Sequence, residues 1–123
     1  MRNARQGTRP AFAALCLLIA GGAFAQEQKT VKEALPAFDK AYLSSKKNVA
    51  AGKDVWDNQC RHCHGAAAYP GKAPKLNPGQ LAPDFIYDRV TYGFGKMPAW
   101  KDVFSDEQRK SVVAYIKSRD FSP

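Results

Sequence analysis

The sequence contains few residues that bind metals or carry redox chemistry: three cysteines, two histidines and two methionines among its 123 residues. It lacks a glycine-rich phosphate loop, a pair of catalytic carboxylates and a plausible nucleophile triad, which argues against the enzyme classes that depend on them. No alternating apolar and polar run predicts a strand, and no apolar run of membrane-spanning length follows residue 25. The length allows one domain and excludes a large multidomain enzyme or a barrel of TIM size.

Negative charge is also scarce. The chain has 11 acidic residues against 19 Lys and Arg, which gives a formal charge of +8. Such an excess suggests a nucleic-acid-binding module, a hypothesis that also requires a basic face with base-reading or stacking groups. The hydrophobic fraction of 45% and the aromatic fraction of 11% exclude a disordered chain. The meaning of the charge therefore depends on where the basic residues lie.

The N-terminus has the three parts of a secretory signal peptide. A basic start is followed by an apolar run over 11–20 and by the small-residue cleavage site Ala23-Phe24-Ala25, and the basic residues are Arg2, Arg5 and Arg9. An uncleaved membrane anchor is the alternative, but the apolar run is shorter than the roughly 20 residues that a spanning helix needs. We therefore expect residues 1–25 to be a signal peptide and the product to be exported to a bacterial periplasm.

Removal of residues 1–25 changes the composition of the chain. The remaining 98 residues carry 16 basic and 11 acidic side chains, a charge of +5, and Cys16 leaves with the signal peptide. Export and the smaller charge both argue against nucleic acid as a partner. The cysteines that remain are Cys60 and Cys63.

The mature chain is predicted to be all-α, with three to five helices and long loops. We divide it into an N-terminal extension, residues 26–47, and a domain, residues 48–121. Helices are expected over residues 49–60 and 83–92, and Gly93 and Gly95 end the second of them. The stretch between them, residues 65–82, is a predicted loop because it holds several turn residues, among them Pro70, Pro74 and Pro78.

The extension allows two interpretations. Pro36 can open a short helix, in which Leu35, Phe38 and Tyr42 would share one face. The same stretch is also compatible with a solvated leader to the domain.

The last helix has the clearest local signals. Ser105 and Gln108 have the spacing of a capping box. Acidic side chains follow in the first turn and basic ones in the last, which matches the helix dipole: Asp106, Glu107, Lys117 and Arg119.

One motif carries redox chemistry. Residues 60–64 read Cys-Arg-His-Cys-His, the C-x-x-C-H pattern of covalent c-type haem attachment. Thiols three positions apart reach the two vinyl groups of one porphyrin and form thioethers. The residue that follows then lies under the iron, so His64 is the expected axial ligand. The motif predicts one haem c, held by Cys60 and Cys63.

Three other interpretations of this motif lack support. A zinc site needs four ligands, and the chain has no second cluster away from residues 60–64. A thioredoxin-like redox site needs a βαβ context, which the helical pattern does not provide. A disulfide between Cys60 and Cys63 would close so small a loop that it would constrain the unfolded chain very little.

Met97 is the expected ligand on the other side of the iron. It is the only methionine after residue 25, it precedes Pro98, and it follows a stretch with glycines at 93 and 95. These residues favour an extended backbone that can approach a flat ring closely, whereas a lone methionine otherwise fills a hydrophobic core. His62 is expected to be an exposed spacer. Without Met97 the iron would be five-coordinate and open to small gases or peroxide.

With these residues the chain resembles the class I c-type cytochromes over about residues 48–121. The resemblance implies a small cytochrome c fold around one haem, in which Gly52 lets the first helix cross the last at Tyr115. Residues 74–76, Pro-Lys-Leu, resemble the segment in which a proline carbonyl accepts a hydrogen bond from the ligand histidine. Met97-Pro98 resembles the sixth-ligand loop.

The resemblance also implies a function. Residues 95–100, Gly-Lys-Met-Pro-Ala-Trp, are similar both to the cytochrome subunit of 4-cresol dehydrogenase-type flavocytochromes and to cytochromes that serve quinoprotein alcohol dehydrogenases. The resemblance implies a periplasmic one-electron carrier that is not itself an enzyme. Such a carrier accepts electrons from a flavoprotein or quinoprotein dehydrogenase and passes them to an oxidase or another cytochrome, towards the respiratory chain. A haem enzyme or gas sensor with an open sixth position is the alternative.

Four lysines lie close in sequence to the segments expected to contact the haem: Lys72, Lys75, Lys96 and Lys101. They are candidates for steering an acidic partner to the exposed haem edge, with an ordinary solvated surface as the alternative. A group of aromatic residues is expected to keep water from most of the haem: Trp56, Phe85, Tyr92, Phe94, Trp100 and Tyr115.

Overall fold

The computed structural model describes residues 34–66 and 71–121, all within one compact unit, Lys32–Pro123. The predicted signal peptide lies outside these residues. The described helices are α1 (Lys40–Ser44), α2 (Lys46–Val55), a π-helical turn (Trp56–Cys60), α3 (Arg61–His64), a 3-10 turn (Pro78–Gln80), α4 (Pro83–Tyr92) and α5 (Asp106–Lys117). The only β-type pairing among the described residues is a single bridge between Phe94 and Met97. The all-α prediction is confirmed.

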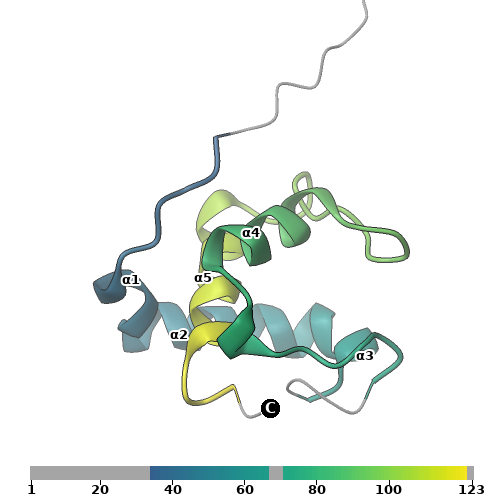
Figure 1. Cartoon of the computed structure of the whole chain (residues 1–123), viewed down its shortest axis with the longest axis horizontal. Coiled ribbons are helices and arrows are strands. Elements are labelled where there is room, and N and C mark those ends of the chain that lie inside the picture. Colours follow the sequence, from purple (N-terminus) through teal and green to yellow (C-terminus); the bar gives the residue numbers. More distant parts are fainter. Residues whose placement is uncertain (1–33, 67–70, 122–123) are drawn as a thin grey trace, which may run out of the picture. The chain divides into compact units, whose positions relative to one another are not determined.

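The crossing of α2 and α5 organises the domain (Figure 1). Gly52 lies where the two helices meet, and a Cβ atom there would come within 1.9 Å of the Ser111 carbonyl oxygen and 2.9 Å of the Tyr115 Cβ. A side chain of any size would therefore force the helices apart. The expectation that Gly52 permits the crossing with Tyr115 is confirmed, which explains a glycine in a helix interior despite its cost of about 1 kcal/mol.

The hydrophobic core is built mainly on α5. Its buried apolar members come from α2, the π-helical turn, α4, α5 and the residues after α5: Val49, Val55, Trp56, Ile86, Tyr87, Val90, Val112, Val113, Ala114, Tyr115, Ile116 and Phe121. The capping box that starts α5 is present, because Ser105 Oγ accepts from the Gln108 N–H and Gln108 Oε1 accepts from the Ser105 N–H. None of the described helices is both long and apolar enough to cross a membrane.

The helix predicted to start at Pro36 is wrong. Residues 34–39 are not helical, and α1 begins at Lys40 because Asp39 Oδ1 accepts the Tyr42 N–H at 2.6 Å and caps the helix there. The Phe38 ring lies 6.0 Å from the Tyr87 ring and 6.1 Å from the Tyr42 ring, measured between centroids. This part of the extension therefore packs against the core instead of forming a solvated leader.

Candidate haem site

A change of helical register precedes the two cysteines. Trp56–Cys60 form a π-helical turn, in which the Arg61 N–H donates to the Trp56 carbonyl, and α3 follows as a single turn. The sequence predicts a continuous helix over 49–60 and contains no signal for this turn. Single π-helical turns inside helices occur frequently at functional sites. Here the turn includes Cys60 and leads directly into α3, which carries Cys63 and His64.

The two thiols lie in different environments. Cys60 is half-buried and packs against the hydrophobic core, whereas Cys63 is exposed, and neither forms a disulfide. Burial, and secondarily the charge of Cys63, raise the pKa of the Cys60 thiol to about 11. Both sulfurs are therefore available as free thiols within one stretch of helix.

His64 is held by Trp56. The two ring centroids are 5.5 Å apart, and Trp56 Nε1 donates to the carbonyls of Gly65 (3.2 Å) and Ala66 (3.0 Å) directly after His64. Gly65 ends α3 with φ +86°, which turns the chain sharply away. Burial lowers the pKa of His64, so the neutral imidazole that a metal requires is favoured. Its Nδ1 is buried and has no hydrogen-bond partner among the described residues.

The predicted bond from His64 to a proline carbonyl is not formed, since Nδ1 has no such partner. The segment that follows is instead attached to the motif through its backbone, because the Ala73 N–H donates to the Cys63 carbonyl at 2.8 Å. Gly71 lies so close that a Cβ there would come within 2.3 Å of the Cys63 oxygen and 2.6 Å of the His64 carbonyl carbon. Pro74 follows directly after this attachment, but its carbonyl does not accept a hydrogen bond from the His64 ring.

The loop after α4 holds Met97 in a tight turn. The Phe94 and Met97 backbones exchange two hydrogen bonds, of 3.0 and 2.9 Å, across a turn in which Gly95 has φ +58°. Gly93 ends α4 at φ +73°, and a Cβ there would come within 2.4 Å of the Met97 oxygen. Further along, the Trp100 N–H donates to the Val90 carbonyl at 3.1 Å. This loop is therefore a fixed structure that returns to α4, and the Met97 side chain is partly buried against the core.

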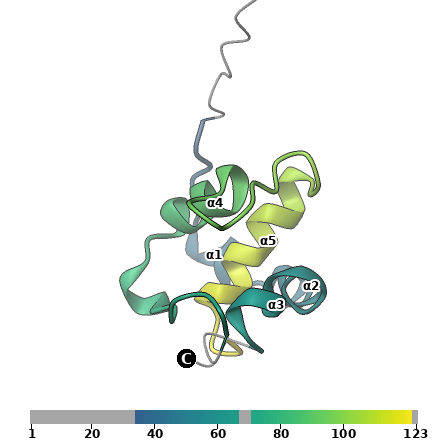
Figure 2. The same cartoon turned by 90° about the vertical axis from the view of Figure 1, so that its right-hand side faces the viewer.

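The helix that ends in the C-x-x-C-H motif and the loop that carries Met97 lie on one side of the domain. This is the right-hand side of Figure 1, where α3 is the lower segment and the loop after α4 the upper one, and Figure 2 shows the same side facing the viewer. The residues present fit haem c: two free thiols, an imidazole whose neutral form is favoured by burial, and a thioether on a fixed loop. The described residues contain no group of three or more His, Cys, Asp or Glu that could hold a metal ion, which disfavours zinc.

Comparison with known proteins assigns the family. Residues 47–116, more than half of the chain, match the family described as cytochrome C oxidase, cbb3-type, subunit III. The chain belongs to this cytochrome c family. It is an electron carrier and not an enzyme, and its cofactor is haem c, covalently attached.

Relatives agree with this assignment. The cytochrome is 36% identical over 74 residues to cytochrome c6 of Bryopsis maxima, covering 53% of this chain and 84% of the relative. It is 35% identical over 69 residues to the 4-cresol dehydrogenase [hydroxylating] cytochrome c subunit of Pseudomonas putida, covering 55% of this chain and 59% of that one. A chain of the Kuenenia stuttgartiensis reducing HAO-like protein complex superposes with a TM-score of 0.50 at 22% identity, over 70% of this chain and 50% of the other, and supports the fold alone.

The other residues singled out from the sequence divide by exposure. His62 is exposed and its Nε2 lies 3.1 Å from the Asn58 carbonyl, so it is directed along its own helix, as expected of a spacer. Of the predicted aromatic cover, Trp56 and Tyr115 belong to the core, whereas Phe85 and Phe94 are 44% and 72% exposed. The Arg89 guanidinium lies over both exposed rings, 4.9 and 4.6 Å from their centroids. The four candidate steering residues are all exposed: Lys72, Lys75, Lys96 and Lys101.

Proposed function

We propose that this cytochrome is a periplasmic one-electron carrier that accepts electrons from a flavoprotein or quinoprotein dehydrogenase. It passes them to an oxidase or another cytochrome, towards the respiratory chain. One haem c is attached through Cys60 and Cys63, with His64 and Met97 as axial ligands. Export follows from a signal peptide over residues 1–25, and residues 26–47 precede the cytochrome domain at 48–121.

The observation that carries the ligand assignment is the state of His64. Its ring is held against Trp56, and burial lowers its pKa, so the neutral form that a metal requires is favoured. A neutral imidazole keeps a lone pair that can bind a metal, so the burial of His64 favours its role as an axial ligand.

The residues of the chain would perform three tasks. Bound haem c supplies an iron that gains and loses one electron. Trp56 orients His64, and its single indole N–H donates to the backbone carbonyls directly after the motif. The paired turn at Phe94 and Met97 holds the thioether in one place, so that little has to move when the charge of the site changes. The apolar core next to Cys60 keeps water from the inner side and helps to set the reduction potential.

The choice of donor is supported by the relatives. The Pseudomonas putida relative is named as the cytochrome c subunit of a dehydrogenase, and the matching family is named for an oxidase subunit. These names describe proteins that exchange electrons within larger assemblies. The proposed carrier would likewise meet redox proteins on both sides of its reaction.

An optical spectrum of the exported holoprotein tests the ligands. The ferric protein is expected to be low-spin and to show the methionine-to-iron charge-transfer band, which disappears in Met97→Ala. Lys96→Ala, in the same turn and exposed, is the control and should keep the band. A wild-type protein that is high-spin and binds small ligands would contradict the assignment of Met97 and support the alternative of an open-site enzyme or sensor.

The mass of the purified protein tests attachment and export together. We expect a chain that begins at Gln26 and carries one haem, with the haem lost from a Cys60→Ala and Cys63→Ala double variant. A periplasmic fraction that lacks the protein, or a product that retains residues 1–25, would contradict the export proposal without affecting the ligand assignment.

A further inference from the structure

The segment from Gly71 to Leu81 leaves the haem motif and crosses to α4 with almost no regular structure of its own. Its backbone groups therefore need partners elsewhere. At its start, the Ala73 N–H donates to the Cys63 carbonyl, and Gly71 packs on the same backbone. Between the two ends, Leu76 packs against the hydrophobic core, and Cys60 packs against the same core.

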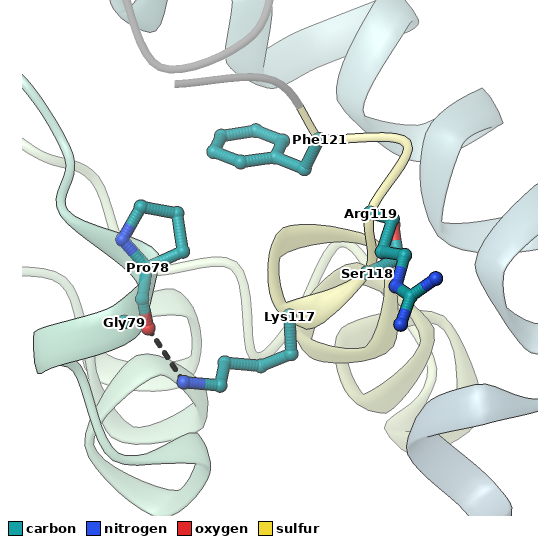
Figure 3. Close-up of a pocket in the computed structure, with 6 residues that line it drawn as sticks. All are labelled: Pro78, Gly79, Lys117, Ser118, Arg119 and Phe121. Atoms are coloured by element: carbon teal, nitrogen blue, oxygen red, sulfur yellow. Dashed lines mark hydrogen bonds between the residues drawn. The ribbon is translucent and has the colours of Figure 1, made fainter.

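The far end of this segment is held by Lys117, the last residue of α5. Its ammonium group donates to the carbonyls of Pro78 (2.5 Å) and Leu81 (2.9 Å). Figure 3 shows the lysine side chain extending from α5 to the Pro78 carbonyl across a surface pocket, with Arg119 at the pocket's edge. Hydrogen bonds from a charged donor are stronger than neutral ones, so a half-buried lysine here is a firm attachment.

Helix α5 also contacts the haem motif from which the segment starts, through Trp56. Two residues before Lys117, the buried Tyr115 ring lies 6.1 Å from Trp56, which holds the backbone at Gly65 and Ala66 beside His64. One turn of α5 therefore fixes the motif through Tyr115 and Trp56, and fixes the end of the following segment through Lys117.

We propose that Lys117 is a positioning residue for the haem site, because it holds residues 71–81 in place on the His64 side. This inference rests on the proposed ligand role of His64. A closed segment limits the access of water to the buried imidazole, and exclusion of water from a haem favours the ferrous state and a higher reduction potential.

Two substitutions of Lys117 separate this role from that of an ordinary surface charge. Lys117→Met keeps the length of the side chain and removes the donor, while Lys117→Arg keeps a cationic donor. Arg119→Met is the matched control, because it removes one positive charge at the edge of the same pocket and Arg119 is exposed. All three are measured as holoprotein.

Amide hydrogen exchange is the first measurement. In Lys117→Met we expect exchange at Ala73 and Leu81 to become about tenfold faster or more, while Lys117→Arg and Arg119→Met remain close to wild type. The redox midpoint is the second measurement. It should fall further in Lys117→Met than in Arg119→Met and should be restored in Lys117→Arg.

Unchanged exchange in Lys117→Met, or a midpoint equal to that of Arg119→Met, would overturn the positioning role. The exchange measurement does not depend on the identity of the iron ligands. If His64 were not the ligand, the ferric spectrum of the wild-type protein would not be that of a low-spin His/Met haem. If Lys117 had no positioning role, that spectrum would stay low-spin, and only the exchange rates and midpoints of the Lys117 and Arg119 variants would fail to differ.

Discussion

Gly52 of α2 faces the Ser111 carbonyl of α5 so closely that an added Cβ would lie 1.9 Å from the oxygen. The contact is between backbones, so no flexible side chain can move aside to relieve it. The same added Cβ would also lie 2.9 Å from the Tyr115 Cβ, which is closer than van der Waals contact allows. The distance between the helix that leads to the haem motif and the last helix is therefore set at this residue.

Gly52→Ala is expected to destabilise the protein although alanine is the better helix former. The gain in helix propensity is about 1 kcal/mol, but separating two packed helices costs more, and we expect a net loss of about 2 kcal/mol in the free energy of unfolding. Denaturant unfolding of the holoprotein measures it. Gly79→Ala is the control, because a Cβ at Gly79 meets nothing within 4 Å. Equal stability of the two variants would show that the helices do not cross as closely as described.

Two glycines of the Met97 loop, Gly93 before the Phe94–Met97 turn and Gly95 within it, differ in what an added side chain would meet. Both have positive φ, +73° at Gly93 and +58° at Gly95, so alanine is strained at either position by about 1 kcal/mol. Only at Gly93 would the Cβ also collide with the Met97 oxygen, at 2.4 Å. We expect Gly93→Ala to weaken or abolish the methionine-to-iron band and Gly95→Ala to retain it.

The comparison of these two variants separates strain from displacement of Met97. Both are examined by ferric absorption spectroscopy and by unfolding in denaturant. A band that is lost to the same extent in both variants would mean that local strain, and not the contact with the Met97 backbone, governs the ligand.

The hydroxyl of Tyr87 is expected to make the free energy of unfolding depend on pH above about pH 10. Burial, and then the hydrogen bond of 2.5 Å from its hydroxyl to Asp106, raise the pKa of Tyr87 to about 12 from an ordinary value of 10.0. The folded protein thus holds this proton more tightly than the unfolded chain. The stabilisation is complete below about pH 10 and is lost as the pH rises to about 12.

Tyr87→Phe removes this contribution. The wild-type free energy of unfolding should therefore fall more steeply than that of Tyr87→Phe between about pH 10 and pH 12, while the two curves run parallel at lower pH. Denaturant unfolding at a series of pH values measures the difference. Parallel curves throughout would be inconsistent with the part-buried hydrogen bond from Tyr87 to Asp106.

Features encoded by neighbouring residues were predictable from the sequence. The C-x-x-C-H motif requires contacts only within residues 60–64, and the capping box joins Ser105 to Gln108 across three positions. The sequence predicts the wrong start for the first helix because two local signals compete. Pro36 is acceptable in a first helical turn, but Asp39 has a side chain that accepts the Tyr42 N–H, and that bond determines where the helix begins.

Features that depend on distant residues could not be read from local patterns. The bonds from Lys117 to Pro78 and Leu81 join residues 39 and 36 positions apart, and a lysine in the last helical turn is explained equally well by the helix dipole. The π-helical turn at Trp56–Cys60 likewise has no compositional signature that separates it from an α-helix. Gly52 was predictable only through resemblance to a family, since helix propensity alone disfavours it.

Exposed lysines near the proposed haem site predict how the cytochrome meets its partner. If Lys72, Lys75, Lys96 and Lys101 steer an acidic redox protein, the bimolecular rate of electron transfer should fall several-fold as ionic strength rises from about 0.01 to 0.15 M, because the Debye length shrinks from about 30 to 8 Å. Replacing all four by glutamine should lower the rate at low salt and flatten its salt dependence. Lys46→Gln with Lys47→Gln removes two exposed charges at the start of α2 and is compared with the pair Lys72→Gln and Lys75→Gln, which removes the same charge near the proposed haem site. Stopped-flow kinetics with an acidic acceptor decide the question, and a wild-type rate that is indifferent to salt would exclude steering.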